Sequence, residues 1–411
     1  MCSFSSYLHS PELLDAVRLK PTAFLRNRKL PFTKLLTALL SGLTASVQNE
    51  LNVFAANLEN RADLWREVSA QAFSKARNGF SHQVFDLLNR RLLALVEQHL
   101  PMPRWRGFRL VAADASKLQL FLKDITARKV REAIAFMLYL PGPELSLSFE
   151  LYSPTVGERQ MLFEHLDRLQ PNDLLLLDRG YPASWLVSVL LARTIAFCMR
   201  VDDTGFGCVK AFRRSGQGEA IVQIAPPSKQ DAKAYRAPRK PCTVRLIRVD
   251  TSNGKCHVVM TSLLDATAYP ASDFANLYHA RWRIEEAYKR IKHRLKLEHL
   301  SGLSWLAAQQ DFGAKLVCDN LNALAVYAAE EPAAAEPDAL EPTYKPNRTY
   351  GIALLKRWLP RWLLKQLPDI DTLFSVFAEL LKHLVRFVPG TSKPRPKRPK
   401  PHLYPAYKSM S

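Results

Sequence analysis

The segment DLLLLD at residues 173–178 restricts the possible folds more than any other part of the chain. Four consecutive leucines between two aspartates cannot alternate between an apolar and a polar face, so the segment is typical of a short strand buried on both faces. Strands of this kind occur in sheets that helices cover on both sides. The segment therefore predicts an α/β fold in which one buried strand ends at Asp178.

The segments around this strand predict a mixed α/β core. Three strand-like runs precede it: FRLVAAD, which ends at Asp114, then REAIAFMLYL and LSLSFELYS, with turn residues 141–143 between the second and third. The run GERQMLFEHLDRL predicts a helix before Asp173, and PASWLVSVLLAR and TIAFCMRV predict a helix and a strand after Asp178. The order of elements is therefore βββαβαβ.

Two aspartates and a glutamate are candidates for a common site. Asp114 and Asp178 each close an apolar strand-like run, where open α/β sheets place their chemistry. Glu285 lies in a stretch from Tyr278 to His299 that contains seven Lys or Arg, three His and three Glu residues. A solvated helix with ion pairs along its face would also explain that stretch. Together the three carboxylates would form an all-oxygen site suited to Mg²⁺ or Mn²⁺.

The spacing of four residues in this stretch is distinctive. Tyr278, Arg281, Glu285 and Lys292 follow one another at intervals of 3, 4 and 7, which places them on one face of a helix. They resemble the signature of the DDE transposases of bacterial insertion sequences, specifically the insertion-sequence 4 family. The motif DRGY beginning at Asp178 resembles the second acidic motif of that family. AADAS around Asp114 resembles the first, with Ala where Gly is commoner.

The resemblance implies a fold and a metal site. The βββαβαβ order would be a ribonuclease H-like catalytic core, in which the first strand lies beside the fourth and Asp114 neighbours Asp178. Asp114, Asp178 and Glu285 would hold two Mg²⁺ ions, for which Mn²⁺ could substitute. Glu286 is the alternative to Glu285, and only the spacing to the flanking signature residues selects between them.

The resemblance also implies contacts with DNA. Tyr278, Arg281 and Lys292 would contact phosphates of the transposon end. Trp282 and Arg283, on adjacent faces of the same helix, are weaker candidates for DNA binding. For Trp282 a place in the core is the preferred interpretation, and base stacking is the alternative.

Residues 1 to about 100 are expected to be helical throughout. Within them, Ser69 is placed as an N-cap before a basic helix that carries Lys75 and Arg77, and Gly79 would end this helix. The pattern is compatible with a helix-turn-helix-like unit that contacts DNA through Lys75 and Arg77. A packed helical bundle explains it equally well.

The composition indicates a polyanionic partner. The chain carries 58 Lys+Arg against 38 Asp+Glu, a formal charge of +20, and its pI is about 9.8. DNA, RNA or an anionic membrane would each satisfy this charge. No apolar run reaches the ~18 residues of a membrane span, no signal sequence is recognised, and the six cysteines form no CxxC pair. The cysteine pattern and the missing membrane and signal features predict a cytoplasmic protein that binds no membrane, and the family resemblance implies a bacterial, nucleoid-associated protein that binds DNA.

The rest of the chain divides by composition. Short strands are predicted in AIVQIAP, TVRLIRVD and HVVMTSLL, the last two joined through residues 252–254, and SKQDAKAYRAPRKP is predicted to be a loop. The predicted regions are 1–104, a helical DNA-binding domain; 105–202 and 267–328, the two parts of the core; 203–266, a β-rich insertion; 329–349, a linker; 350–390, a C-terminal helical region; and 391–411, a disordered basic tail.

The function that the resemblance implies is cut-and-paste transposition. The protein would cleave phosphodiester bonds at terminal inverted repeats and join the released 3′-OH to target DNA, as a homodimer in the synaptic complex. Two alternatives remain open. One is a nuclease without strand transfer, and the other is an inactive, transposase-derived DNA-binding protein.

Overall fold

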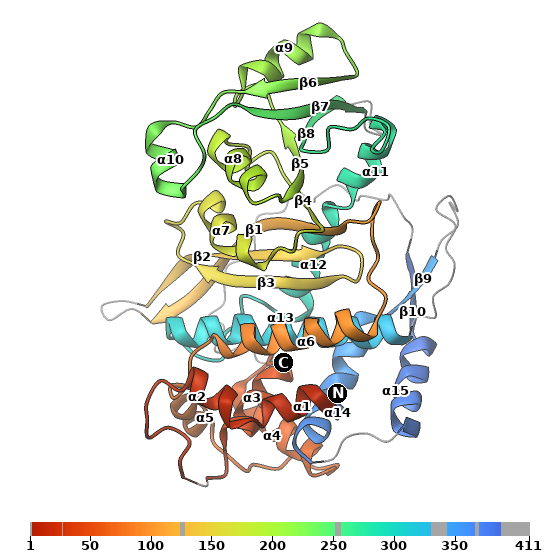
Figure 1. Ribbon diagram of the computed structural model, residues 1–411. Helices are drawn as coiled ribbons and strands as arrows, with labels where there is room; N and C mark the ends of the chain where they lie inside the picture. Colours follow the sequence, from red (N-terminus) through yellow and green to blue (C-terminus); the bar gives the residue numbers. More distant parts are fainter. Residues whose placement is uncertain are drawn as a thin grey trace. The chain divides into compact units, whose positions relative to one another are not determined.

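Contacts within the chain divide the computed structural model into two units (Figure 1). The structure describes residues 2–26, 28–123, 128–250, 256–329, 343–365 and 370–387. The first unit comprises Met1–Gln98, Leu118–Glu132 and Arg290–Ser411, and the second comprises His99–Lys117 and Ala133–Lys289. The predicted tail, residues 330–342 of the predicted linker and the predicted turn at residues 252–254 lie outside the described residues.

One mixed sheet organises the second unit. Its strands are β1 (Arg109–Lys123), β2 (Arg128–Leu140), β3 (Leu145–Tyr152), β4 (Asp173–Leu177), β5 (Ala196–Val201), β6 (Glu219–Ile224), β7 (Cys242–Asp250) and β8 (Cys256–Thr261). Their order across the sheet is β3-β2-β1-β4-β5-β8-β7-β6. β1, β4 and β5 run parallel, whereas β3 pairs antiparallel with β2 and the strands from β8 to β6 continue antiparallel from β5.

This order confirms the predicted fold class, a ribonuclease H-like core with β1 beside β4. All five residues of β4 are buried, because β1 and β5 flank the strand and apolar side chains lie against both of its faces. The unbroken leucine run therefore indicated the environment of β4 correctly. The insertion does not form a sheet of its own, since β8 pairs with β5 and extends the core sheet.

The extent of β1 differs from the prediction. The run FRLVAAD was expected to end its strand at Asp114, but β1 continues to Lys123. After Asp114 every second residue is a buried leucine, at positions 118, 120 and 122, and this alternation maintains the strand. Asp114 therefore lies within a strand rather than at its end, although pairing with β4 stops at Ala112.

The second unit also contains helices. They are α7 (Glu158–His165), η1 (Leu166–Arg168), α8 (Ser184–Ala192), α9 (Gly207–Ser215), α10 (Lys229–Tyr235), η2 (Ala271–Asp273), α11 (Phe274–His279) and α12 (Trp282–Arg294), whose last residues belong to the first unit. The prediction of a loop at SKQDAKAYRAPRKP is wrong. Ser228 caps α10 there, and Tyr235 stacks on Trp185 of α8 with ring centroids 3.6 Å apart.

The first unit is built mainly of helices. They are α1 (Cys2–Leu8), α2 (Pro11–Val17), α3 (Phe32–Leu40), α4 (Val47–Leu58), α5 (Ala70–Arg77), α6 (Val84–His99), α13 (Trp305–Ala329), α14 (Arg348–Leu364) and α15 (Ile370–Lys382), with a small sheet of β9 (Thr343–Pro346) and β10 (Leu384–Phe387). α14 packs against α3 and α4, and its Lys356 pairs with Glu50 at 2.9 Å. The N-terminal and C-terminal helical regions therefore share one unit. No helix of the described segments is long and apolar enough to span a membrane.

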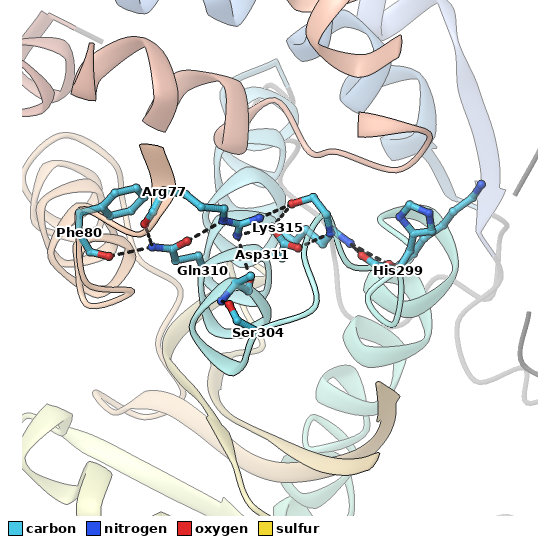
Figure 2. Close-up of polar contacts among 10 residues, drawn as sticks. Arg77, Phe80, His299, Ser304, Gln310, Asp311 and Lys315 are labelled. Carbon is cyan, nitrogen blue, oxygen red and sulfur yellow. Dashed lines mark hydrogen bonds and ion pairs between the residues drawn. The ribbon is translucent and has the colours of Figure 1, made fainter. Parts of the chain in front are cut away.

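A buried polar network joins α5 to α13 (Figure 2). The Arg77 guanidinium donates to the Asp311 carboxylate at 2.8 Å and to the Gln310 side chain at 2.8 Å. Lys315, one turn beyond Asp311, donates to the carbonyl oxygens of Lys296 and His299. Burial lowers the pKa of Lys315 to about 8. The network therefore buries several charged groups in the interior of the first unit.

Candidate active site and nucleic-acid interface

The pairing of β1 with β4 brings two predicted carboxylates to one place. Ala112 is the register partner of Leu176, and the same register continued by two residues sets Asp114 against Asp178. The register itself is fixed at the other end of the pair. There the Arg109 guanidinium holds the Asp173 carboxylate through buried contacts of 2.6 and 2.8 Å. A slip of one residue would break that ion pair and turn over the side chains of the strand that slipped, which would place the two site aspartates on opposite faces of the sheet.

The third carboxylate comes from the first turn of α12, and a tyrosine on the same helix face fixes this helix to β1. Tyr288 follows Glu285 by three residues. Its buried hydroxyl donates to the carbonyl oxygens of Ala135, at 2.7 Å, and of Asp114 itself, at 3.1 Å. The sequence analysis missed Tyr288, because a tyrosine at a core position of a helix gives no sign of its hydrogen-bond acceptors.

Burial and neighbouring charged groups change the pKa of Asp114. Burial raises its pKa to about 7; the positive charge of Arg281 opposes the rise, and the nearby carboxylates of Asp178 and Glu285 add to it. The three acids are therefore close enough to sense one another's charge. A cation placed among them would favour the ionised form of Asp114.

Arg281 partly balances this negative charge. Its guanidinium donates to the Glu285 carboxylate at 2.8 Å, and its Nε is buried without a hydrogen-bond partner. Arg281 is 6% exposed and Tyr278 is 8% exposed. Both side chains therefore lie in the interior, and Arg281 is paired with a site carboxylate; their contact with DNA phosphates stays a prediction.

The donor set suits a divalent ion, because carboxylate oxygens are the ligands that Mg²⁺ and Mn²⁺ prefer. Among the residues that the structure describes, no three His, Cys, Asp or Glu side chains already converge at metal-binding distances. Arg281 occupies one oxygen of Glu285.

The other predicted DNA contacts on α12 differ in how far their side chains are exposed to solvent. Trp282 is 44% exposed, so its predicted place in the core is wrong. It shares the exposed face with Glu286 and Lys289, whereas the apolar face of the helix is opposite. Arg283 is half-buried, with its guanidinium 3.6 Å from Glu144. Lys292 is half-buried, in the part of α12 that belongs to the first unit.

The two predicted DNA contacts of α5 separate in the structure. Arg77 is 1% exposed and its donors are directed into the network of Figure 2, so this network explains its place in the helix without a contact to DNA. Lys75 is exposed and lines a cleft of about 960 Å³ within the first unit. Four further cations line the same cleft: Lys20, Arg26, Arg28 and Lys29. The sequence analysis missed these four, although the basic run at 26–29 is visible in the sequence.

A single acidic residue, Glu67, lines this cleft. Its carboxylate is held by Lys34 at 2.6 and 2.7 Å, so the charge of Glu67 is already compensated. The cleft is therefore a positively charged surface, as a phosphate backbone requires.

The ribonuclease H-like sheet and its acidic cluster define an enzyme that acts on phosphodiester bonds. The profile of the family described as "Transposase DDE domain" matches residues 109–321, more than half of the chain and all three candidate carboxylates. The chain therefore belongs to the DDE transposase family. It is a DNA transposase, and the family uses divalent metal ions.

Two known proteins illustrate the relationship. The transposase InsG for insertion sequence element IS4 of Escherichia coli (strain K12) is 23% identical over 324 residues, which cover 73% of this chain and 70% of that protein. The resemblance to insertion-sequence transposases is thereby confirmed. A piggyBac transposase, solved by cryo-electron microscopy as a synaptic complex with hairpin DNA, aligns with a TM-score of 0.43 at 11% identity over 95% of this chain and 86% of that one.

Proposed function

We propose that this transposase performs cut-and-paste transposition of an insertion sequence. It would cleave phosphodiester bonds at the terminal inverted repeats and join the released 3′-OH to target DNA. The observation that supports this most directly is the β1–β4 register, which sets Asp114 against Asp178, with Glu285 held nearby on the helix that Tyr288 fixes to β1. Three carboxylates from separate elements would be costly to gather without a cation to bind.

In this proposal Asp114, Asp178 and Glu285 hold two Mg²⁺ ions, for which Mn²⁺ substitutes. Bound ions would neutralise charge at the attacking and leaving oxygens of the scissile phosphate. Asp114 would bind a cation most strongly once it is deprotonated. Because its pKa is raised, this deprotonation depends on a nearby cation. Arg281 donates to the Glu285 carboxylate at 2.8 Å and thereby orients it.

DNA would be held at two kinds of surface. On α12, the exposed Trp282 and the half-buried cations Arg283 and Lys292 are the proposed contacts. In the first unit, Lys75 and the basic cleft are the proposed contacts with the backbone of the end sequence. We also propose a homodimer in the synaptic complex, because an element has two ends to bring together, and association with the nucleoid, because the net charge is +20.

The decisive experiment incubates the purified protein and Mg²⁺ with linear DNA that carries the inverted repeats of the element. Strand-transfer products would support the proposal. Cleavage without transfer would identify a nuclease, and binding alone would identify an inactive DNA-binding derivative. Asp178→Asn serves as the control, because it should remove the products and leave binding of the ends within several-fold.

A further inference from the structure

A fourth carboxylate lies beside the proposed metal ligands. Glu158 is the first residue of α7, and Gly180 lies between it and Asp178. A methyl group placed on Gly180 would lie 3.1 Å from Asp178 Oδ1 and 3.6 Å from Glu158 Oε2, so both carboxylates face the same small space. The Gly180 amide donates to Asp178 Oδ1 at 2.7 Å, which fixes the aspartate at this position.

The placement of Glu158 is held by its neighbour in sequence. Arg159 Nε lies 3.0 Å from the carbonyl oxygen of Gly180 and 3.0 Å from that of Tyr181, and donates to both. The start of α7 is thereby tied to the loop that follows β4. Glu158 consequently remains near Asp178, and the negative charge of Asp178 adds to the effect of burial in raising the pKa of Glu158.

A buried hydroxyl at the same place lacks a partner. Tyr181 is 0% exposed, and its OH makes no hydrogen bond within the described structure. The acidic groups in its electrostatic environment are Glu158, Asp114 and Asp178. Leaving a buried donor unpaired costs about 1–3 kcal/mol. A ligand that carried a water molecule or an oxygen atom into the acidic cluster would satisfy this hydroxyl.

We propose that Glu158 is a fourth carboxylate of the divalent-ion site, acting beside Asp178 either directly or through a bound water. The distances permit this role. Asp178 Oδ1 and Glu158 Oε2 both lie within 3.6 Å of a methyl group placed on Gly180. Divalent ions that bind oxygen at ~2.1 Å and are spaced ~3.5–4 Å apart can lie between two oxygens this close together. The inference rests on the proposed function, since it takes Asp114, Asp178 and Glu285 as metal ligands.

The test is a titration of the full-length protein with Mn²⁺ alone, in which the free ion is followed by its electron paramagnetic resonance signal. Glu158→Gln keeps the shape of the side chain and removes its charge. We expect it to raise the dissociation constant for Mn²⁺ at least about tenfold, the effect of losing a supporting ligand group. Glu164→Gln, the same change in the same helix, should leave the constant unchanged, and Glu158→Asp should recover part of the affinity.

The outcomes separate the two proposals. Wild-type Mn²⁺ affinity in Glu158→Gln, together with loss of binding in Asp178→Asn, would overturn the role of Glu158 and leave the proposed function intact. Equal weakening by Glu158→Gln and Glu164→Gln would also overturn it, because a general loss of negative charge would then explain both. Unchanged binding in Asp114→Asn and Asp178→Asn would instead overturn the proposed metal site. Melting without metal verifies that each variant is folded.

Discussion

Replacing Tyr288 by phenylalanine tests whether α12 is fixed to β1 by one hydroxyl group. The substitution keeps the ring and removes the donor that reaches Ala135 O at 2.7 Å and Asp114 O at 3.1 Å. A net hydrogen bond contributes about 0.5–1.5 kcal/mol, and a buried acceptor left unpaired costs more. We therefore expect the free energy of unfolding of the metal-free protein to fall by about 1–2 kcal/mol.

Tyr181→Phe is the matched control for this experiment. Tyr181 is also a fully buried tyrosine of the second unit, but its hydroxyl has no hydrogen-bond partner among the described residues. Removing that hydroxyl breaks no hydrogen bond and relieves an unsatisfied donor, so stability should rise or stay within about 0.5 kcal/mol. Urea unfolding without divalent ions, followed by fluorescence, measures both variants.

Activity provides the second measurement. Misplacing Asp114 relative to Glu285 by a fraction of an ångström should slow Mg²⁺-dependent cleavage by about tenfold, since geometry near the reacting atoms strongly affects the rate. Binding of DNA ends should not change in Tyr288→Phe. Equal stability losses in Tyr288→Phe and Tyr181→Phe, or a Tyr288→Phe protein with the wild-type cleavage rate, would refute the anchoring role of Tyr288.

Four further predictions concern charge. The raised pKa of Asp114, about 7, means that the folded protein binds an extra proton between the unfolded and folded pKa values, so this group's contribution to stability is full at low pH and is lost as the pH rises through 7. Metal-free Asp114→Asn should therefore unfold with a flatter pH dependence over that window, and an unchanged profile would contradict the assignment. Arg77→Met should destabilise the protein by about 3–5 kcal/mol because it leaves Asp311 buried without its partner. Lys75→Ala should leave stability within about 0.5 kcal/mol but lower both DNA affinity and its salt slope; a wild-type slope would exclude Lys75 from the interface. Finally, Lys292→Ala should cost about 1.5–3 kcal/mol in end-complex or transition-state stability and Lys289→Ala less than about 1 kcal/mol, and equal cleavage defects would reduce the signature to a generic basic helix.

The sequence by itself determined the identity of the core and the order of its parts. Four leucines between two aspartates allow little except a strand with both faces buried, and this is the environment of β4. The spacing from Tyr278 to Lys292 predicted one helix face, but the structure divides these residues: Tyr278 belongs to α11, Arg281 lies in the turn before α12, and Glu285 and Lys292 belong to α12. The prediction of a ribonuclease H-like DDE transposase came from the resemblance of the motifs around Asp114, Asp178 and Glu285 to those of a known family.

Tertiary structure decided what each charged side chain contacts. From the sequence, Arg77 and Lys75 are equivalent cations on one basic helix, yet Arg77 is buried because Asp311, which follows it by more than two hundred residues, supplies a carboxylate there. Arg281 likewise turns toward Glu285 and the acidic cluster rather than toward solvent. Glu158 approaches Asp178 only through packing of the loop after β4 against the start of α7. Burial and pairing depend on contacts between residues distant in sequence, and a local sequence pattern cannot predict those contacts.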